Sequence, residues 1–176
     1  MLTACRVEDG AIFLLKTWDP EKTGGEIPRE EVDAAVRSAF QRYKVVAMRA
    51  DVHEFESYVD EWGKDFRRDI KVKASPKNPV AFDMRGYKKQ FALDCERFVD
   101  ALLEGEIVHN GDPRMRWYIL NTHRHPTNYD AVSIRKKSKD SSRKIDGAVT
   151  AVLAFAARQD YMLSRQYRTG RGGVIR

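Results

Sequence analysis

Two aspartates and one run of basic residues are the parts of this sequence that could carry chemistry. Asp146 opens the segment KIDGAVTAVLAFAAR, residues 144–158, and Asp51 ends the apolar run VVAMRAD. The segment before Asp146, RKKSKDSSRK at residues 135–144, holds six cations against one anion. Carboxylates hold divalent metal ions and cations contact phosphates, so the combination indicates a metal-dependent enzyme that acts on a phosphate backbone.

The element that must position Asp146 is a buried helix. Its apolar residues recur at i, i+3, i+4 and i+7, which predicts one broad face packed against a sheet; they are Ile145, Ala148, Val149, Val152, Leu153 and Ala156. Asp146 then lies in the first turn, where the helix dipole stabilises an anion. A helix-start charge with no catalytic role is therefore the alternative interpretation of Asp146.

Asp51 depends on a helix followed by a short strand. Pro28 suits the first turn of a helix over residues 28–43, and residues 45–51 have the length and apolarity of a buried strand. In open α/β sheets chemistry gathers at the carboxyl ends of strands, which is where Asp51 falls. The alternative is that Asp51 caps the following helix, because Asp is a preferred N-cap residue.

The remaining segments fill out a mixed α/β pattern. Residues 2–7 and 11–18, separated by Glu8-Asp9-Gly10, predict a hairpin. The other expected elements are helices over residues 53–66, 82–103 and 114–121, strands over residues 70–74 and 131–134, and a polar loop over residues 122–130. His123 and His125 in that loop are interpreted as exposed residues, because an isolated H-x-H has no metal-site spacing.

Bulk composition favours one globular domain, residues 2–158, followed by a basic, flexible tail at residues 159–176. Residues 109–176 hold 14 Lys or Arg against 5 Asp or Glu, so the C-terminal part is the part expected to face a polyanion. No apolar run reaches membrane-spanning length and no signal peptide is evident, so we expect the protein inside a cell. Cys5 and Cys95 are expected to be reduced and buried.

Several segments stand in a telling order and spacing over residues 2–158; they are LLKTWDP, EIPREEV, VVAMRAD, LLEGEIVHNGDP with WYILN, and KIDGAVTAVLAFA. Together they resemble the C-terminal nuclease domain of phage terminase large subunits. The resemblance implies a ribonuclease H-like fold, in which helices flank a central mixed sheet. It also implies an acidic cluster that binds two Mg or Mn ions, with Asp51 and Asp146 as two of its catalytic ligands.

The family's function is endonucleolytic cleavage of concatemeric viral DNA during genome packaging. The implied partners are double-stranded DNA, an ATPase domain of the same polypeptide, the terminase small subunit and the portal, all in the host cytoplasm. Basic side chains before the last helix would then contact phosphates; they are Lys136, Lys137, Lys139, Arg143 and Lys144.

The chain departs from the family's pattern at its start. Family members carry their first catalytic Asp on a strand immediately before the hairpin, and that strand and the ATPase domain are both absent here. We therefore expect a fragment with weak or absent cutting. Two other hypotheses stay open: a non-catalytic DNA-binding or assembly module, and another ribonuclease H-like nuclease such as a resolvase.

Overall fold

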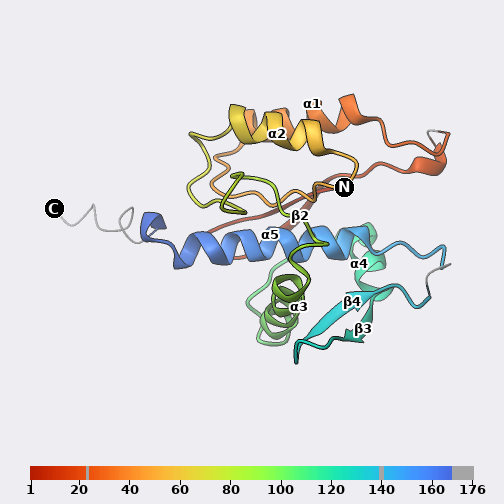
Figure 1. Ribbon diagram of the computed structural model, residues 1–176. Coiled ribbons are helices and arrows are strands. Elements are labelled where there is room, and N and C mark those ends of the chain that lie inside the picture. The colour runs from red at the N-terminus through yellow and green to blue at the C-terminus, as the bar shows by residue number, and fades with distance from the viewer. Residues whose placement is uncertain (23, 139–140, 168–176) are drawn as a thin grey trace. The chain divides into compact units, whose positions relative to one another are not determined.

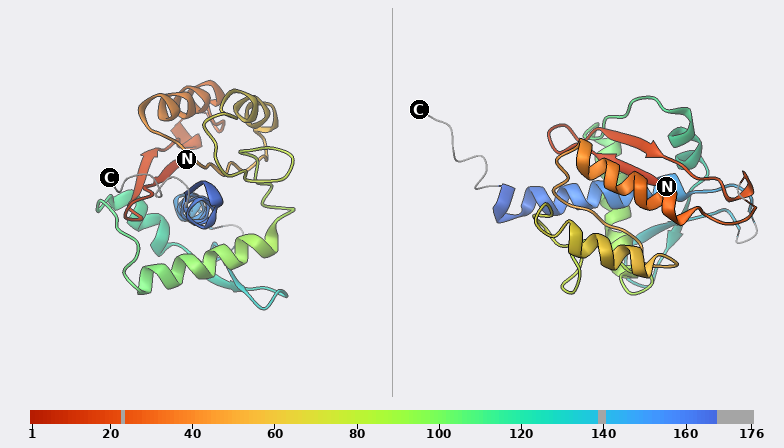
Figure 2. Two further views of the ribbon diagram at one scale, coloured as in Figure 1. Left: turned by 90° about the vertical axis from the view of Figure 1, so that its left-hand side faces the viewer. Right: turned by 90° about the horizontal axis from the view of Figure 1, so that it is seen from above.

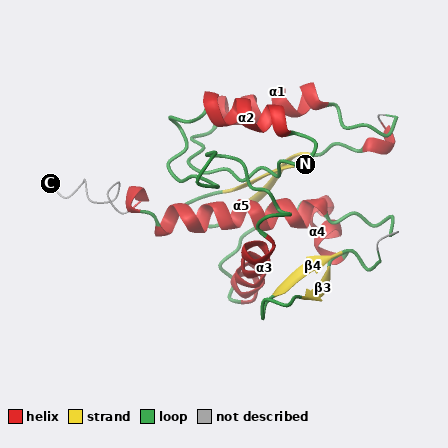
Figure 3. Ribbon diagram, viewed as in Figure 1, coloured by secondary structure: helices red, strands yellow, loops and turns green. Residues whose placement is uncertain are grey.

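The computed structural model describes residues 1–22, 24–138 and 141–167 and shows a mixed α/β protein (Figure 1). Two strands, a run of helices, two more strands and a last helix follow one another, and the strands form two separate two-stranded sheets among these residues (Figure 3). The elements are β1 Leu2–Cys5, β2 Ile12–Lys16, the 3₁₀ helix η1 Pro20–Lys22, α1 Arg29–Arg42, α2 Glu56–Asp65, α3 Lys88–Leu103, α4 Pro113–Leu120, β3 His123–Pro126, β4 Val132–Arg135 and α5 Asp146–Leu163. None of the described helices is both long and apolar enough to span a membrane.

The chain divides into two compact units. Unit 1 contains Met1–Thr17 and Met84–Ala156, and unit 2 contains Trp18–Asp83 and the chain from Ala157 onward. The division runs through the predicted domain of residues 2–158 and assigns different parts of α5 to different units. Because α5 continues to Leu163, residues 159–163 are helical, whereas the predicted tail from residue 168 onward lies outside the described residues.

Unit 1 is built on the predicted N-terminal hairpin, which the structure confirms. β1 and β2 pair antiparallel with Cys5 opposite Ile12, and Gly10 takes a positive φ of 71° in the turn. Thr3 and Thr150 join the hairpin to α5 through a 2.7 Å hydrogen bond between their hydroxyl oxygens. The hydrophobic core of unit 1 comes largely from α3 and α5. Its buried side chains include Phe91, Ala92, Cys95, Phe98, Ala148, Val152, Leu153 and Phe155.

A second hairpin in unit 1 corrects the loop predicted over residues 122–130. β3 and β4 pair antiparallel, and their teal ribbon can be followed in Figure 2. In this pairing His123 lies opposite Arg135 and Pro126 opposite Val132. The prediction of a strand over residues 131–134 is confirmed by β4. Its partner β3 is not predicted, because its sequence HRHP lacks the alternation of apolar and polar residues that indicates a strand. β4 is held to α3, because the Val132 amide donates a 2.9 Å hydrogen bond to Glu96 Oε1.

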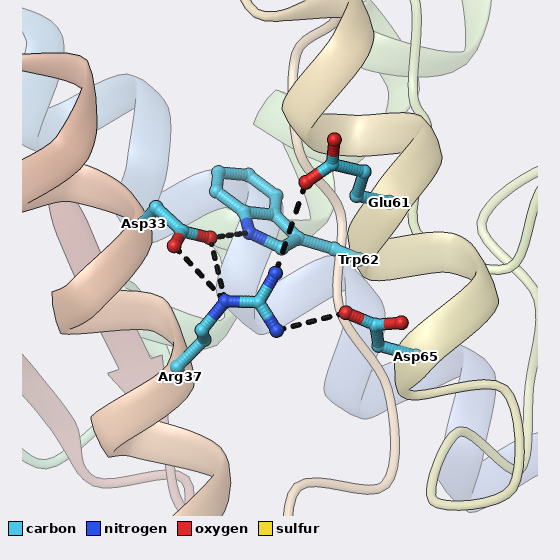
Figure 4. A network of polar contacts seen from close by, with 5 residues as sticks. All are labelled: Asp33, Arg37, Glu61, Trp62 and Asp65. Atoms are coloured by element: carbon cyan, nitrogen blue, oxygen red, sulfur yellow. Dashed lines mark hydrogen bonds and ion pairs between the residues drawn. The ribbon is translucent and has the colours of Figure 1, made fainter.

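Unit 2 contains α1 and α2, which a polar network joins (Figure 4). We call it the Arg37 cluster. The Arg37 Nε donates to Asp33 at 2.9 Å, and its Nη1 lies 2.8 Å from Asp65 on α2. Asp33 also accepts a 2.7 Å hydrogen bond from Trp62 Nε1, and Glu61 lies 3.9 Å from the guanidinium. One helix therefore holds the other by charge-assisted hydrogen bonds.

The predicted strand over residues 45–51 is largely absent. Only Ala50 forms a bridge, parallel to Ala81: its amide donates to Val80 O and its carbonyl accepts from Phe82 N, both at 2.8 Å. The strand predicted over residues 70–74 is also absent, and α3 begins at Lys88, six residues later than predicted. Residues 80 and 82 are instead fully buried in unit 2, where an extended path places Val80 and Phe82 inward.

Candidate functional site

Asp146 lies in the first turn of α5, as predicted, and its side chain is exposed. Its neighbours Ile145, Gly147 and Ala148 are buried, so the carboxylate stands at the rim of an apolar element. Burial lowers the pKa of the Met1 amino group below its usual value, and attraction to the Asp146 carboxylate opposes that shift. The start of β1 and the start of α5 therefore share one electrostatic environment.

Residues from α4 and the turn after it fix the beginning of α5. A Cβ atom at Gly147 would lie 2.3 Å from Tyr118 Cδ2, so glycine allows the Tyr118 ring to pack directly on the first turn. The buried Asn121 donates from Nδ2 to the Lys144 carbonyl at 3.2 Å. The backbone is thus held before Asp146, at Lys144, and after it, at Gly147.

The basic segment before α5 supplies unpaired cations. Lys137 and Arg143 are exposed and Lys136 is half-buried, and none of these three has a carboxylate partner among the residues that the structure describes. Lys144 is half-buried at the helix start, and Lys139 lies outside the described residues. Unit 1 therefore carries Asp146 together with uncompensated positive charge.

Asp51 belongs to unit 2 and is exposed directly after the Ala50 bridge. The alternative that Asp51 caps the next helix is wrong, because α2 begins at Glu56 and its N-cap residue is Phe55. Arg49 anchors the backbone beside Asp51: its side chain is 5% exposed, pairs with Asp160 at 2.6 Å and lies 4.6 Å from the centre of the Phe82 ring.

Asp51 and Asp146 are carried by different units, one in each. Within the described residues no group of three or more His, Cys, Asp or Glu side chains is placed to hold a metal ion. A two-metal centre needs several carboxylates around each pair of ions, and the donors present in either unit do not meet that requirement.

Sequence reasoning missed two groups of residues. The first is the buried pair of Arg49 and Asp160, which lie 111 positions apart, so no local pattern connects them. The second is the set of basic side chains on β3. Its signal is the segment HRHP, whose Arg124 comes to lie beside Arg135 only once β4 fixes the register.

Comparisons with known proteins place the chain among phage proteins. No protein-family model matches it, and no solved structure does. A protein of Mycobacterium phage D29 called "Gene 13 protein" is 63% identical over 175 residues, which is 99% of this chain and 29% of the relative. The "Gene 13 protein" of Mycobacterium phage L5 is 62% identical over 175 residues, again 99% of this chain and 30% of the relative. The chain thus spans about three tenths of the length of the curated relatives it matches, and their source supports a phage origin for it.

Proposed function

We propose that this chain is the nuclease region of a phage terminase large subunit, with a ribonuclease H-like fold and a site that cuts concatemeric DNA during packaging. The observation that supports the proposal most directly is the exposed Asp146 at the start of the buried α5, directly after a basic segment. The sequence resemblance points in the same direction, and the mycobacteriophage relatives support the phage origin that the proposal requires. The greater length of those relatives leaves room for an ATPase domain in the same polypeptide.

In this proposal Asp51 and Asp146 are metal ligands for Mg or Mn, and the basic segment binds the DNA backbone. Ions held there together with the acid of the family's first strand would supply an activated water and charge stabilisation of the leaving oxygen. The residues of this chain would supply ligands and bind phosphates, and the ATPase domain, the small subunit and the portal would act in the host cytoplasm.

Nicking of supercoiled plasmid in Mg or Mn tests the proposal, with this chain and with a longer form that includes the family's acid-bearing first strand. We expect Mn- or Mg-dependent nicking by the longer form and weak or no nicking by this chain. Asp146→Asn should abolish the activity, because it removes a ligand without changing the side-chain shape. Asp130→Asn is the matched control: it removes the same charge from an exposed residue of unit 1 at φ 55°, a conformation that Asn tolerates. If the longer form with both acids intact never cuts under any divalent ion, the enzyme proposal is wrong.

A non-catalytic DNA-binding module is the second candidate. It is favoured by the lack of a metal-binding group among the described residues. This candidate predicts salt-sensitive DNA binding that is the same in EDTA and in Mg, and that Asp51→Asn leaves unchanged.

A further inference from the structure

The open end of the β3–β4 hairpin, where β3 begins and β4 ends, gathers basic side chains that are not among the five phosphate contacts proposed for the basic segment. His123 begins β3 and lies opposite Arg135, which ends β4, and Arg124 is the next residue on β3. All three are exposed. We call them the basic hairpin end. The chain continues from Arg135 directly into Lys136 and Lys137.

The charges of the basic hairpin end are uncompensated. Arg124 and Arg135 have no carboxylate partner within the described part of the chain. Other arginines of the protein are paired with carboxylates: Arg6 with Asp9, Arg37 with Asp65, Arg49 with Asp160, and Arg114 with Asp112. Pairing is therefore common in this protein, and the basic hairpin end is a place where it is missing.

The register gives these side chains a definite arrangement. Side chains of successive strand residues point to opposite faces, so His123 and Arg135 share one face of the ribbon and Arg124 lies on the other. The position opposite Arg124 is Ile134, which is apolar, so no acid is placed across from it either. Positive charge is thus presented on both faces at one end of the ribbon.

We propose that the basic hairpin end binds the phosphate backbone of duplex DNA, as a second element beside the basic segment before α5. The inference rests on the proposed action of this chain on DNA. Arg presents a planar set of donors that matches phosphate oxygens, and a histidine ring carries an N–H donor even when it is neutral. Each DNA strand carries one phosphate per about 3.4 Å of helix axis, so two arginines at one end of the ribbon can each contact a phosphate. Such contacts position DNA without reading its sequence.

Charged residues on an exposed strand have another use, which is to prevent edge-to-edge pairing of sheets. That role needs charge on the strand but no partner. It predicts that removing the charges raises self-association and leaves DNA affinity unchanged, so the two roles separate in one experiment.

The test measures binding of this chain to a 20-base-pair duplex in EDTA, by fluorescence anisotropy from 50 to 200 mM salt. EDTA excludes cutting, so the result does not depend on whether the nuclease proposal is correct. The variant Arg124→Gln/Arg135→Gln should make the negative slope of log K against log salt shallower by about 2, because each phosphate contact contributes about −0.9 to that slope. The variant Arg124→Lys/Arg135→Lys should keep most of the slope, because it keeps both charges.

Arg67→Gln/Arg68→Gln is the matched control. Both arginines are exposed in unit 2 and lack a carboxylate partner among the described residues, so the net charge changes equally. The control should leave the slope close to that of the wild type. An unchanged slope in the hairpin variant, or an equal loss in the control, would overturn the proposal. A single-stranded RNA of the same length is the comparison ligand, and tighter binding of RNA that the hairpin variant abolishes would overturn the assignment to duplex DNA. Binding that behaves as proposed, with no cutting by the longer form, would leave the hairpin assignment intact and reject the nuclease alone.

Discussion

Replacing Gly147 with alanine is the sharpest test of how the start of α5 is held. In an isolated helix this change favours folding by about 1 kcal/mol, because glycine loses more backbone freedom. Here the added Cβ would lie 2.3 Å from Tyr118 Cδ2, 2.7 Å from its Cγ and 2.9 Å from its Cβ. The last of these atoms is bound to the backbone of α4, so a side-chain rotation alone does not remove the conflict.

Overpacking of this kind costs about 1–3 kcal/mol. Over most of that range the cost exceeds the stabilisation of about 1 kcal/mol that helix propensity gives to alanine. We therefore expect Gly147→Ala to lower the free energy of unfolding by about 1 kcal/mol and Tm by about 2–4 °C. Urea unfolding followed by circular dichroism measures the change, with an unchanged m-value as the check on two-state behaviour.

A double-mutant cycle with Tyr118→Ala isolates the cause. Alanine at 118 removes Cγ and Cδ2, so in that background Gly147→Ala should become neutral or stabilising by up to about 1 kcal/mol. If Gly147→Ala stabilises the protein while Tyr118 is still present, the close packing of α4 on α5 does not exist and the account of how Asp146 is positioned is wrong.

Two further predictions follow from buried polar groups. Asp160→Asn removes the carboxylate that pairs with the buried Arg49. Because Asp160 itself is 35% exposed, we expect the free energy of unfolding in urea to fall by about 1–3 kcal/mol, less than for a fully buried pair. A fall of less than about 0.3 kcal/mol would contradict the pairing. Burial raises the pKa of the Cys95 thiol to about 12, so at pH 8 a thiol reagent should modify the half-buried Cys5 quickly and Cys95 only as fast as the protein unfolds. Equal labelling rates for the two thiols would contradict the burial of Cys95. The same pKa shift means that Cys95 contributes stability below the unfolded pKa near 9, and that this contribution is lost as pH rises from about 9 to 12.

The sequence predicts the helices of this protein better than its strands. α5 is evident because its apolar residues repeat with helical spacing and Asp146 marks its first turn, and α1 is evident from the stripe after Pro28. The N-terminal hairpin is evident because both strands are apolar and Gly10 lies between them. Cys95 is buried as expected, whereas Cys5 is only half-buried.

Strands fail where a partner decides the outcome. The run over residues 45–51 is apolar enough for a strand, but only Ala50 forms a β-bridge, with hydrogen bonds to residues 80 and 82, while Val46 accepts one bond from the Lys71 amide. β3 fails in the opposite direction, since a strand of two histidines, an arginine and a proline is formed by pairing with β4 and has no local signal. For the candidate site, residue type pointed to Asp146 and the basic segment, but the anchoring of Arg49 by Asp160 required the fold.

The interleaving of the two units has a consequence for the order in which the chain can fold during synthesis. The β1–β2 hairpin is synthesised before the elements that cover it, because the hydroxyl partner of Thr3 is Thr150 on α5, 147 residues later in the chain. Unit 1 needs Met84–Ala156 to cover its first hairpin, and unit 2 includes the chain from Ala157 onward. A nascent chain therefore exposes the apolar strand Ile12–Lys16 until α5 has been synthesised, which is a long interval for an uncovered strand to meet other chains.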